Sequence, residues 1–152
     1  MALDNDEVIA TLNNLVETCK DGQNGFHTAA EGIKNSELTT LFKTYSQQRA
    51  QFAAELQSEV RRLGGEPEDT GSAAAAVHRG WINIKSTVTG EDEAAVISEC
   101  ERGEDSAVAA YEEALETDLP NDVKAIVSHQ FSQVKEAHDR IRSLERANAK
   151  TS

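Results

Sequence analysis

Apolar residues recur along the chain in alternating steps of three and four, which is the spacing of one face of an α-helix. The first stripe predicts a helix over about residues 4–34, and the second predicts one over about 37–63, capped by Ser36 and stopped at Gly64 and Gly65. The third and fourth stripes predict helices over about 91–117 and 120–147, the last starting at Pro120.

The connections between these helices differ in length. The first and the last are a few residues long, which makes the helices that they join antiparallel neighbours. The middle connection, residues 64–90, begins with glycine, proline and acidic residues and continues into a short helix predicted over about 73–88. At about 1.5 Å per helical residue it is long enough to cross a bundle lengthwise. We therefore expect the second and third long helices to run parallel, with Trp81 holding the crossover against the bundle.

Composition places the chain in the all-α class, as a single domain over residues 1–152. Hydrophobic residues make up 38% of the sequence and aromatic residues only 5%. The 27 acidic residues outnumber the 15 basic ones, and the resulting charge of -12 repels nucleic-acid phosphates and anionic lipid headgroups. No apolar run reaches the ~20 residues that span a bilayer, and the first residues lack the pattern of a secretion signal. We expect a cytoplasmic protein that binds neither nucleic acid nor membrane.

Each long helix carries polar residues or glycine near its midpoint. Arg49 and Glu104 fall on the apolar stripes of the second and third helices, so both side chains are expected to point inward. Neither charge can be buried alone, and we predict a buried Arg49–Glu104 pair. Asp21, Lys135 and His138 lie beside the other two stripes and complete the predicted polar layer, with Asp21 or His138 supporting the pair.

Three glycines stand at the same level, and we expect Gly22, Gly25 and Gly103 to let a neighbouring backbone approach. Each costs about 1 kcal/mol of helix propensity relative to alanine. Glu99 and the other acids around Gly103, apart from Glu104, are expected to face water.

Motifs of known chemistry are missing from the sequence. It contains no GxSxG, GxGxxG, GxxxxGK[ST] or HExxH pattern, so hydrolase, nucleotide and zinc-protease readings have no support. Cys19 and Cys100 lack CxxC spacing and are expected to be buried, free thiols on opposite sides of the polar layer.

Several segments resemble a bacterial family of small uncharacterised proteins: "ETCKDGQNGFHTAAEG", "YSQQRAQFAAELQSEVRRLGGEP", "HRGWINIK", "ECERGEDSAVAAYEEAL" and "QVKEAHDRIRSL". The resemblance implies a ferritin-like four-helix bundle of unknown function with a loose association with stress responses. The long crossover and the helix lengths are also similar to those of ferritin-like bundles.

Ferritin-like di-metal sites use a carboxylate on the first and third helices and Glu-x-x-His on the second and fourth. Carried over to this sequence, the resemblance implies the ligands Glu17 or Asp21, Glu101 or Glu104, and His138. The second helix departs from the pattern because Ser46 and Arg49 stand where Glu and His are needed, and Lys135 replaces the Glu of the fourth helix. A guanidinium has only donors and repels a dication, so we interpret the site as degenerate.

Three functions remain open. The first is a non-catalytic protein without a cofactor that acts by self-association, as a two-fold homodimer, or by binding a protein partner. The second is a di-metal iron or manganese oxidase, or an iron-binding protein, using Glu17, Asp21, Glu101, Glu104 and His138. The third is a small-molecule or lipid pocket beside the crossover and Trp81.

Overall fold

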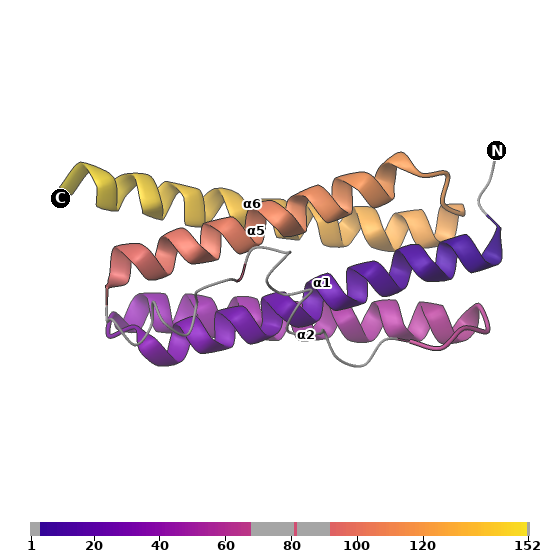
Figure 1. Cartoon of the computed structure of the whole chain (residues 1–152), viewed down its shortest axis with the longest axis horizontal. Coiled ribbons are helices and arrows are strands. Elements are labelled where there is room, and N and C mark those ends of the chain that lie inside the picture. Colours follow the sequence, from indigo (N-terminus) through magenta and orange to yellow (C-terminus); the bar gives the residue numbers. More distant parts are fainter. Residues whose placement is uncertain (1–3, 68–80, 82–91, 152) are drawn as a thin grey trace.

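The computed structural model describes residues 4–67, Trp81 and residues 92–151, and within these residues four long helices form an all-α bundle (Figure 1). They are α1 (Asn5–Gly32), α2 (Ser36–Arg62), α5 (Glu93–Glu116) and α6 (Asn121–Thr151). The predicted helices agree with these bounds to within a few residues, and α6 continues to Thr151, beyond the predicted end at about residue 147. The short helix predicted over about 73–88 lies outside the described residues except for Trp81, which is not helical.

Side chains at the helix ends account for these boundaries. α1 and α5 begin at the aspartate caps Asp4 and Asp92. α2 is capped by Asn35 and not by Ser36, since the Asn35 side chain accepts two backbone N–H groups of the first turn, at 3.0 and 3.2 Å. After α2, Gly64 has a φ of 86°, a left-handed conformation that favours glycine and ends the helix.

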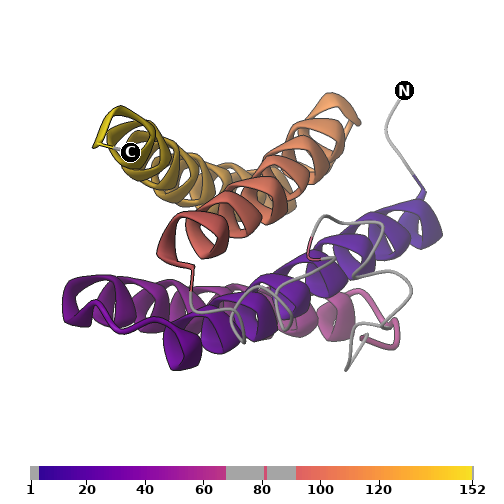
Figure 2. The ribbon, with the colours of Figure 1, turned by 60° about the vertical axis from the view of Figure 1, so that its left-hand side comes forward.

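The helices form two antiparallel hairpins, α1–α2 and α5–α6, which cross at an angle (Figure 2). α2 and α5 run in the same direction along the bundle, as the unequal connection lengths predict, because α2 ends at one end and α5 begins at the other (Figure 1). α1 packs along α2 and also against α5, whereas α2 and α6 touch only weakly. Contact between the hairpins is therefore carried mainly by α1 and α5.

The core consists of two apolar clusters, one toward each half of the bundle. Cys19 belongs to the first cluster and Cys100 to the second, and both are buried free thiols, as the sequence predicts. In every helix the residues between the clusters include the polar or glycine positions at the midpoint. Among the described residues, no helix is both long and apolar enough to cross a membrane.

Candidate functional site

Arg49 of α2 and Glu104 of α5 meet at the level between the two apolar clusters. Their side chains are 1% and 0% exposed. The Arg49 Nη1 and Nη2 groups donate to Oε1 and Oε2 of Glu104 at 2.5 and 2.6 Å, which is a bidentate arrangement. The structure thus brings together the two charged residues that the stripes point inward.

Residues of α1 and α2 hold the rest of the Arg49 side chain, and one of them, Gln48, links it to α6. Its stem lies over Gly22 of α1, where an added Cβ would stand 3.3 Å from Arg49 Cγ. Its Cζ lies 5.5 Å from the centre of the Phe26 ring, within the range of a cation–π contact. Nε donates to Gln48 at 3.3 Å, and Gln48 in turn donates to Gln133 of α6 at 3.2 Å. Together with the carboxylate on α5, these contacts connect the guanidinium to all four helices.

The electrostatics of the pair favour the charged arginine. Desolvation acts to lower the pKa of Arg49, but the charge and hydrogen bonds of Glu104 outweigh it and raise the pKa above its ordinary value. Burying two charges is costly, and good geometry is needed to repay the cost. An arginine that stays charged has five donors and no lone pair, so it cannot ligate a metal.

The other members of the predicted layer lie in different surroundings. Asp21 is buried on α1, next to Gly22, the glycine against which the Arg49 side chain lies. Lys135 is half-exposed and pairs with Asp139 at 3.4 Å, so the prediction that places it in a buried layer is wrong. His138 is buried, but its ring nitrogens contact Asp105 and Asp139 and not the arginine pair. Successive residues of an α-helix are rotated by about 100° about its axis. His138, one position off the apolar stripe of α6, therefore lies at the flank of the bundle.

Trp81 fills the space that two glycines leave. A Cβ atom on Gly25 of α1 or on Gly103 of α5 would overlap with the indole. The indole also packs edge-on against Phe26, with ring centroids 5.2 Å apart. The prediction that a neighbouring backbone approaches these glycines is therefore wrong. The Trp81 indole lies against Gly25 and Gly103, and the Arg49 side chain lies against Gly22.

A second polar chain crosses the first apolar cluster, and it was not predicted from the sequence. The Tyr111 hydroxyl donates to Gln130 Oε1 at 2.7 Å, and Gln130 Nε2 donates to Glu55 at 3.2 Å and to the Phe52 carbonyl at 3.3 Å. At the other end, Cys19 Sγ lies 3.1 Å from the Tyr111 hydroxyl. The signal in the sequence is a glutamine on the apolar stripe of α6, a polar residue that needs partners when buried.

A mixed group of carboxylates and one histidine lies where α5 flanks α6. Glu101, Asp105 and His138 each offer a ligand atom within 4.8 Å of the others, and this is the one such group among the described residues. Desolvation lowers the pKa of His138, but its bonds to Asp139 and Asp105 outweigh this and raise it. A hydrogen bond with Glu145 is the main cause that raises the pKa of Glu101 to about 7, and desolvation and the negative charges of Glu145 and Asp105 add to it.

The acids around Gly103 do not all face water as expected. The Glu99 side chain is only 9% exposed and pairs with Arg102, one turn further along α5, at 3.0 Å. Asp105, by contrast, is 60% exposed. The face of α5 that packs against its neighbours is therefore wider than the predicted stripe.

The ligand set implied by the ferritin-like resemblance was Glu17, Asp21, Glu101, Glu104 and His138. Of these, Glu101 and His138 take part in a group of candidate ligands at the flank of the bundle. Their partner there is Asp105, which was not predicted as a ligand. Glu104 is held by Arg49 instead. A fixed guanidinium repels a dication, so the interior does not fit the di-metal centre of ferritin-like proteins.

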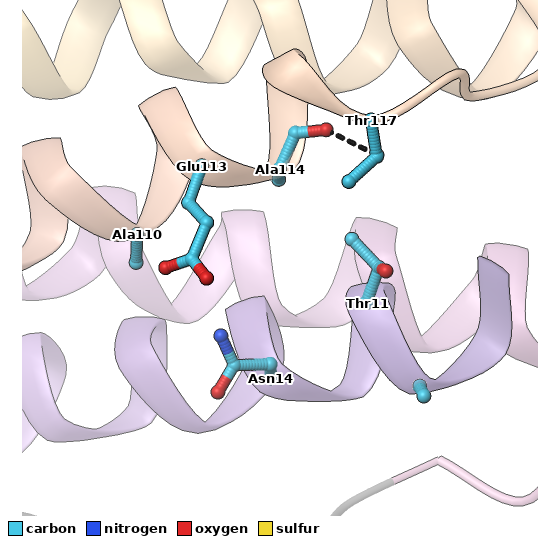
Figure 3. A pocket seen from close by; sticks show the side chains of 7 residues that line it. Thr11, Asn14, Ala110, Glu113, Ala114 and Thr117 are labelled. Atoms are coloured by element: carbon cyan, nitrogen blue, oxygen red, sulfur yellow. Dashed lines mark hydrogen bonds between the residues drawn. The ribbon is translucent and has the colours of Figure 1, made fainter. Parts of the chain in front are cut away.

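Two surface clefts of about 250 Å³ each are found between helices. The first lies between α1 and α5, where Asn14 and Glu113 point toward each other across the opening (Figure 3). The second lies between α2 and α6 and is lined partly by Ala125 and Ile126. Trp81 lines neither cleft, so these openings do not match a ligand pocket beside it.

The arrangement of the four helices defines a ferritin-like bundle. One similar solved structure is a two-domain protein of Anabaena variabilis that contains DJ-1/ThiJ/PfpI-like and ferritin-like domains, with a TM-score of 0.78 and 16% identity. The likeness covers 97% of this chain and 41% of that one, so this chain spans less than half the length of its neighbour. At this identity the comparison shows the fold alone.

Residues 7–117 match the family described as "Domain of unknown function (DUF2383)", and the chain belongs to that family. The matched residues span most of α1 and all of α2 and α5, and they include both partners of the buried ion pair. The family description names no activity. No curated protein matches the chain.

Proposed function

We propose that this protein is a non-catalytic ferritin-like bundle, without a resident cofactor, that acts by binding a second copy of itself. The observation that carries the proposal is the bidentate Arg49–Glu104 pair, because it lies in the bundle interior where a ferritin-like metal centre would need ligands. The indole of Trp81 fills further space nearby, between α1 and α5. An interior filled in this way leaves the surface as the place where the protein acts.

The face formed by α2 and α6 fits this contact best. These two helices touch only weakly, and the cleft between them exposes Ala125 and half-buried Ile126. With a charge of -12, two copies repel each other over most of their surfaces. Repulsion is smallest where acidic residues are few, and each cleft is lined by one acid, Glu55 here and Glu113 in the other. The weak contact between α2 and α6 and the half-buried Ile126 therefore decide between the two clefts. A two-fold axis through this face would bring two such clefts together.

Light scattering after size-exclusion chromatography tests the proposal at tens of micromolar protein. We expect a dimer for the wild type and a monomer for Ala125→Glu, because each of the two copies then places an added negative charge in the contact. The matched control is Ala10→Glu, an exposed alanine that lines the cleft between α1 and α5, and it should stay dimeric. A monomeric wild type, or a dimer broken equally by both variants, would contradict the proposal.

The non-catalytic part of the proposal is tested separately with ferrous iron. Ferritin-like oxidases consume oxygen when they oxidise iron, and we expect the protein to oxidise ferrous iron no faster than buffer does. The interior carboxylate gives the control: if the wild type oxidises iron and Glu104→Gln does not, the interior holds an active metal centre and the proposal is wrong.

The cellular setting is also proposed, on the strength of the resemblance. We propose a cytoplasmic, stress-related protein that binds neither nucleic acid nor membrane. Comparing survival of a deletion strain and its parent under oxidative, osmotic and acid stress tests the role, and cell fractionation tests the location. Equal survival of the two strains under every stress would count against the proposed stress-related role.

A further inference from the structure

We infer that Glu101, Asp105 and His138 form a binding site for one divalent transition-metal ion on the flank of the bundle. The site lies between α5 and α6 and uses only these two helices. It is therefore different from the four-helix interior position, which the buried ion pair occupies. It also goes beyond the proposed self-association, because metal binding and dimer formation are measured independently.

The donor set decides which ions the site takes. It combines two carboxylates with one imidazole. Calcium and magnesium prefer oxygen ligands alone, whereas zinc, cobalt, iron and manganese accept mixed nitrogen and oxygen ligands. The expected ligand is therefore a first-row transition cation such as Zn²⁺, with solvent completing its coordination.

The helices fix the positions of the three ligands. Glu101 and Asp105 are four residues apart and lie on one face of α5, one turn from each other. His138 faces them from α6, which packs along α5 in the same hairpin. No loop movement is needed to assemble the site.

The distances require only a small adjustment of side chains. Ligand atoms at about 2.0–2.2 Å from a metal stand about 3.0–3.5 Å from one another. His138 Nε2 and Asp105 Oδ1 are now 2.5 Å apart, and all three ligand atoms lie within 4.8 Å. Because Asp105 is 60% exposed, its carboxylate is able to rotate and admit the ion.

The orientation of His138 distinguishes this group from an ordinary acidic patch. Its side chain is only 8% exposed, and its Nδ1 lies 3.1 Å from Asp139 Oδ1. Metal binding needs the neutral ring in which Nδ1–H donates to Asp139, because Nε2 then gives up the proton that it shares with Asp105 and its lone pair becomes available to the ion. Metal-binding histidines are commonly held in this way by a second carboxylate, which fixes the ring and its tautomer.

Other charges around the site modify its affinity. Glu145 shares a hydrogen bond with Glu101 and adds a fourth carboxylate. The Arg142 Nε lies 3.9 Å from Glu101 Oε1 and is the cation that competes with a metal for that ligand. Lys135 is paired with Asp139 on the far side of the histidine. Removing the arginine charge should therefore strengthen metal binding.

The test uses the full chain, freed of metal with a chelator and titrated with Zn²⁺ by calorimetry, with Co²⁺ absorption as a second readout. We expect one ion per chain, undisturbed by excess Ca²⁺ or Mg²⁺. Asp105→Asn and His138→Gln should each weaken binding at least about tenfold, and Asp139→Asn by about tenfold or more through loss of orientation. Arg142→Gln should tighten it severalfold.

An exposed pair elsewhere in the chain supplies the matched control. His27 lies 2.5 Å from Glu31 on α1, and both side chains are about two-thirds exposed, at 64% and 65%. His27→Gln should leave Zn²⁺ affinity unchanged. Asp105→Asn, at an exposed position, should keep the wild-type unfolding midpoint in chelator, so its weaker binding is not a folding defect. A wild type that binds no Zn²⁺ at millimolar concentration, or an Asp105→Asn variant that binds as tightly as the wild type, would overturn the inference.

Discussion

Arg49 and Glu104 are joined by two hydrogen bonds of 2.5 and 2.6 Å at a point where neither side chain reaches water. The arginine comes from one helical hairpin and the glutamate from the other, so the pair connects the two halves of the bundle. A buried ion pair adds little net stability compared with an apolar pair of similar volume, but losing one partner leaves an uncompensated charge. We therefore expect the pair to fix how the hairpins align more than how strongly they associate.

Arg49→Ala should lower the free energy of unfolding by about 3–5 kcal/mol, because it leaves the Glu104 carboxylate buried without its cation. Arg49→Met combined with Glu104→Gln removes both charges and should recover much of that loss. Urea unfolding of Arg49→Ala, of Arg49→Met and Glu104→Gln alone, and of the double variant measures these values. A single variant with the wild-type midpoint would show that the pair contributes nothing, and a double variant that loses as much as Arg49→Met and Glu104→Gln together, or more, would refute the coupling.

The alternating stripes were enough to predict the four long helices and the inward direction of Arg49 and Glu104. This works because burial of a helix face leaves a periodic trace in the sequence, and a charge on that face needs a partner. The parallel course of α2 and α5 followed from connection length alone (Figure 1).

The positions that were misjudged depend on packing between distant segments. His138 stands one residue off the apolar stripe of α6, and its side chain contacts Asp105 and Asp139 at the flank of the bundle. Gly25 and Gly103 showed that something approaches closely, but only the folded chain reveals that it is the indole of Trp81. Asp105 follows Glu104 directly and, being exposed, leaves no periodic signal.

Gly103→Ala should destabilise the protein by about 1–3 kcal/mol, since the new methyl group would overlap with the Trp81 indole. In the Trp81→Ala background the overlap is gone, and the same change should stabilise α5 by up to about 1 kcal/mol through helix propensity. Urea unfolding of the four proteins gives both values. An equal effect of Gly103→Ala in the two backgrounds would show that the indole does not lie against this glycine.

Both thiols should be unreactive in the folded protein. Burial is the main cause that raises the pKa of Cys19 to about 11, and it also raises the pKa of Cys100. At pH 8 an aromatic disulfide reagent should label neither thiol quickly, and it should label two after addition of denaturant. Fast labelling of either cysteine without denaturant would contradict their burial.

The same shift predicts how stability depends on pH. The folded pKa of Cys19 lies above the ordinary value of 9.0, so the folded state keeps a proton that the unfolded state releases. The contribution of this thiol is therefore complete below about pH 9 and is lost as the pH rises toward 11. Cys19→Ala should show a shallower fall in the free energy of unfolding over this range than the wild type, and identical slopes would argue against the shift.

Tyr111→Phe should cost about 1–3 kcal/mol, because it leaves the buried Gln130 Oε1 without the donor that now lies 2.7 Å away. Gln130→Met together with Tyr111→Phe removes both polar partners while keeping a similar volume, and we expect the double variant to be more stable than Tyr111→Phe alone. The control is Tyr45→Phe, at a half-buried tyrosine of α2, which should change stability by less than about 0.5 kcal/mol. Thermal and urea unfolding of these variants compare the costs directly. If Tyr111→Phe proves as mild as Tyr45→Phe, or if the double variant is no more stable than Tyr111→Phe alone, the hydrogen-bonded chain from Cys19 to Glu55 does not act as a unit.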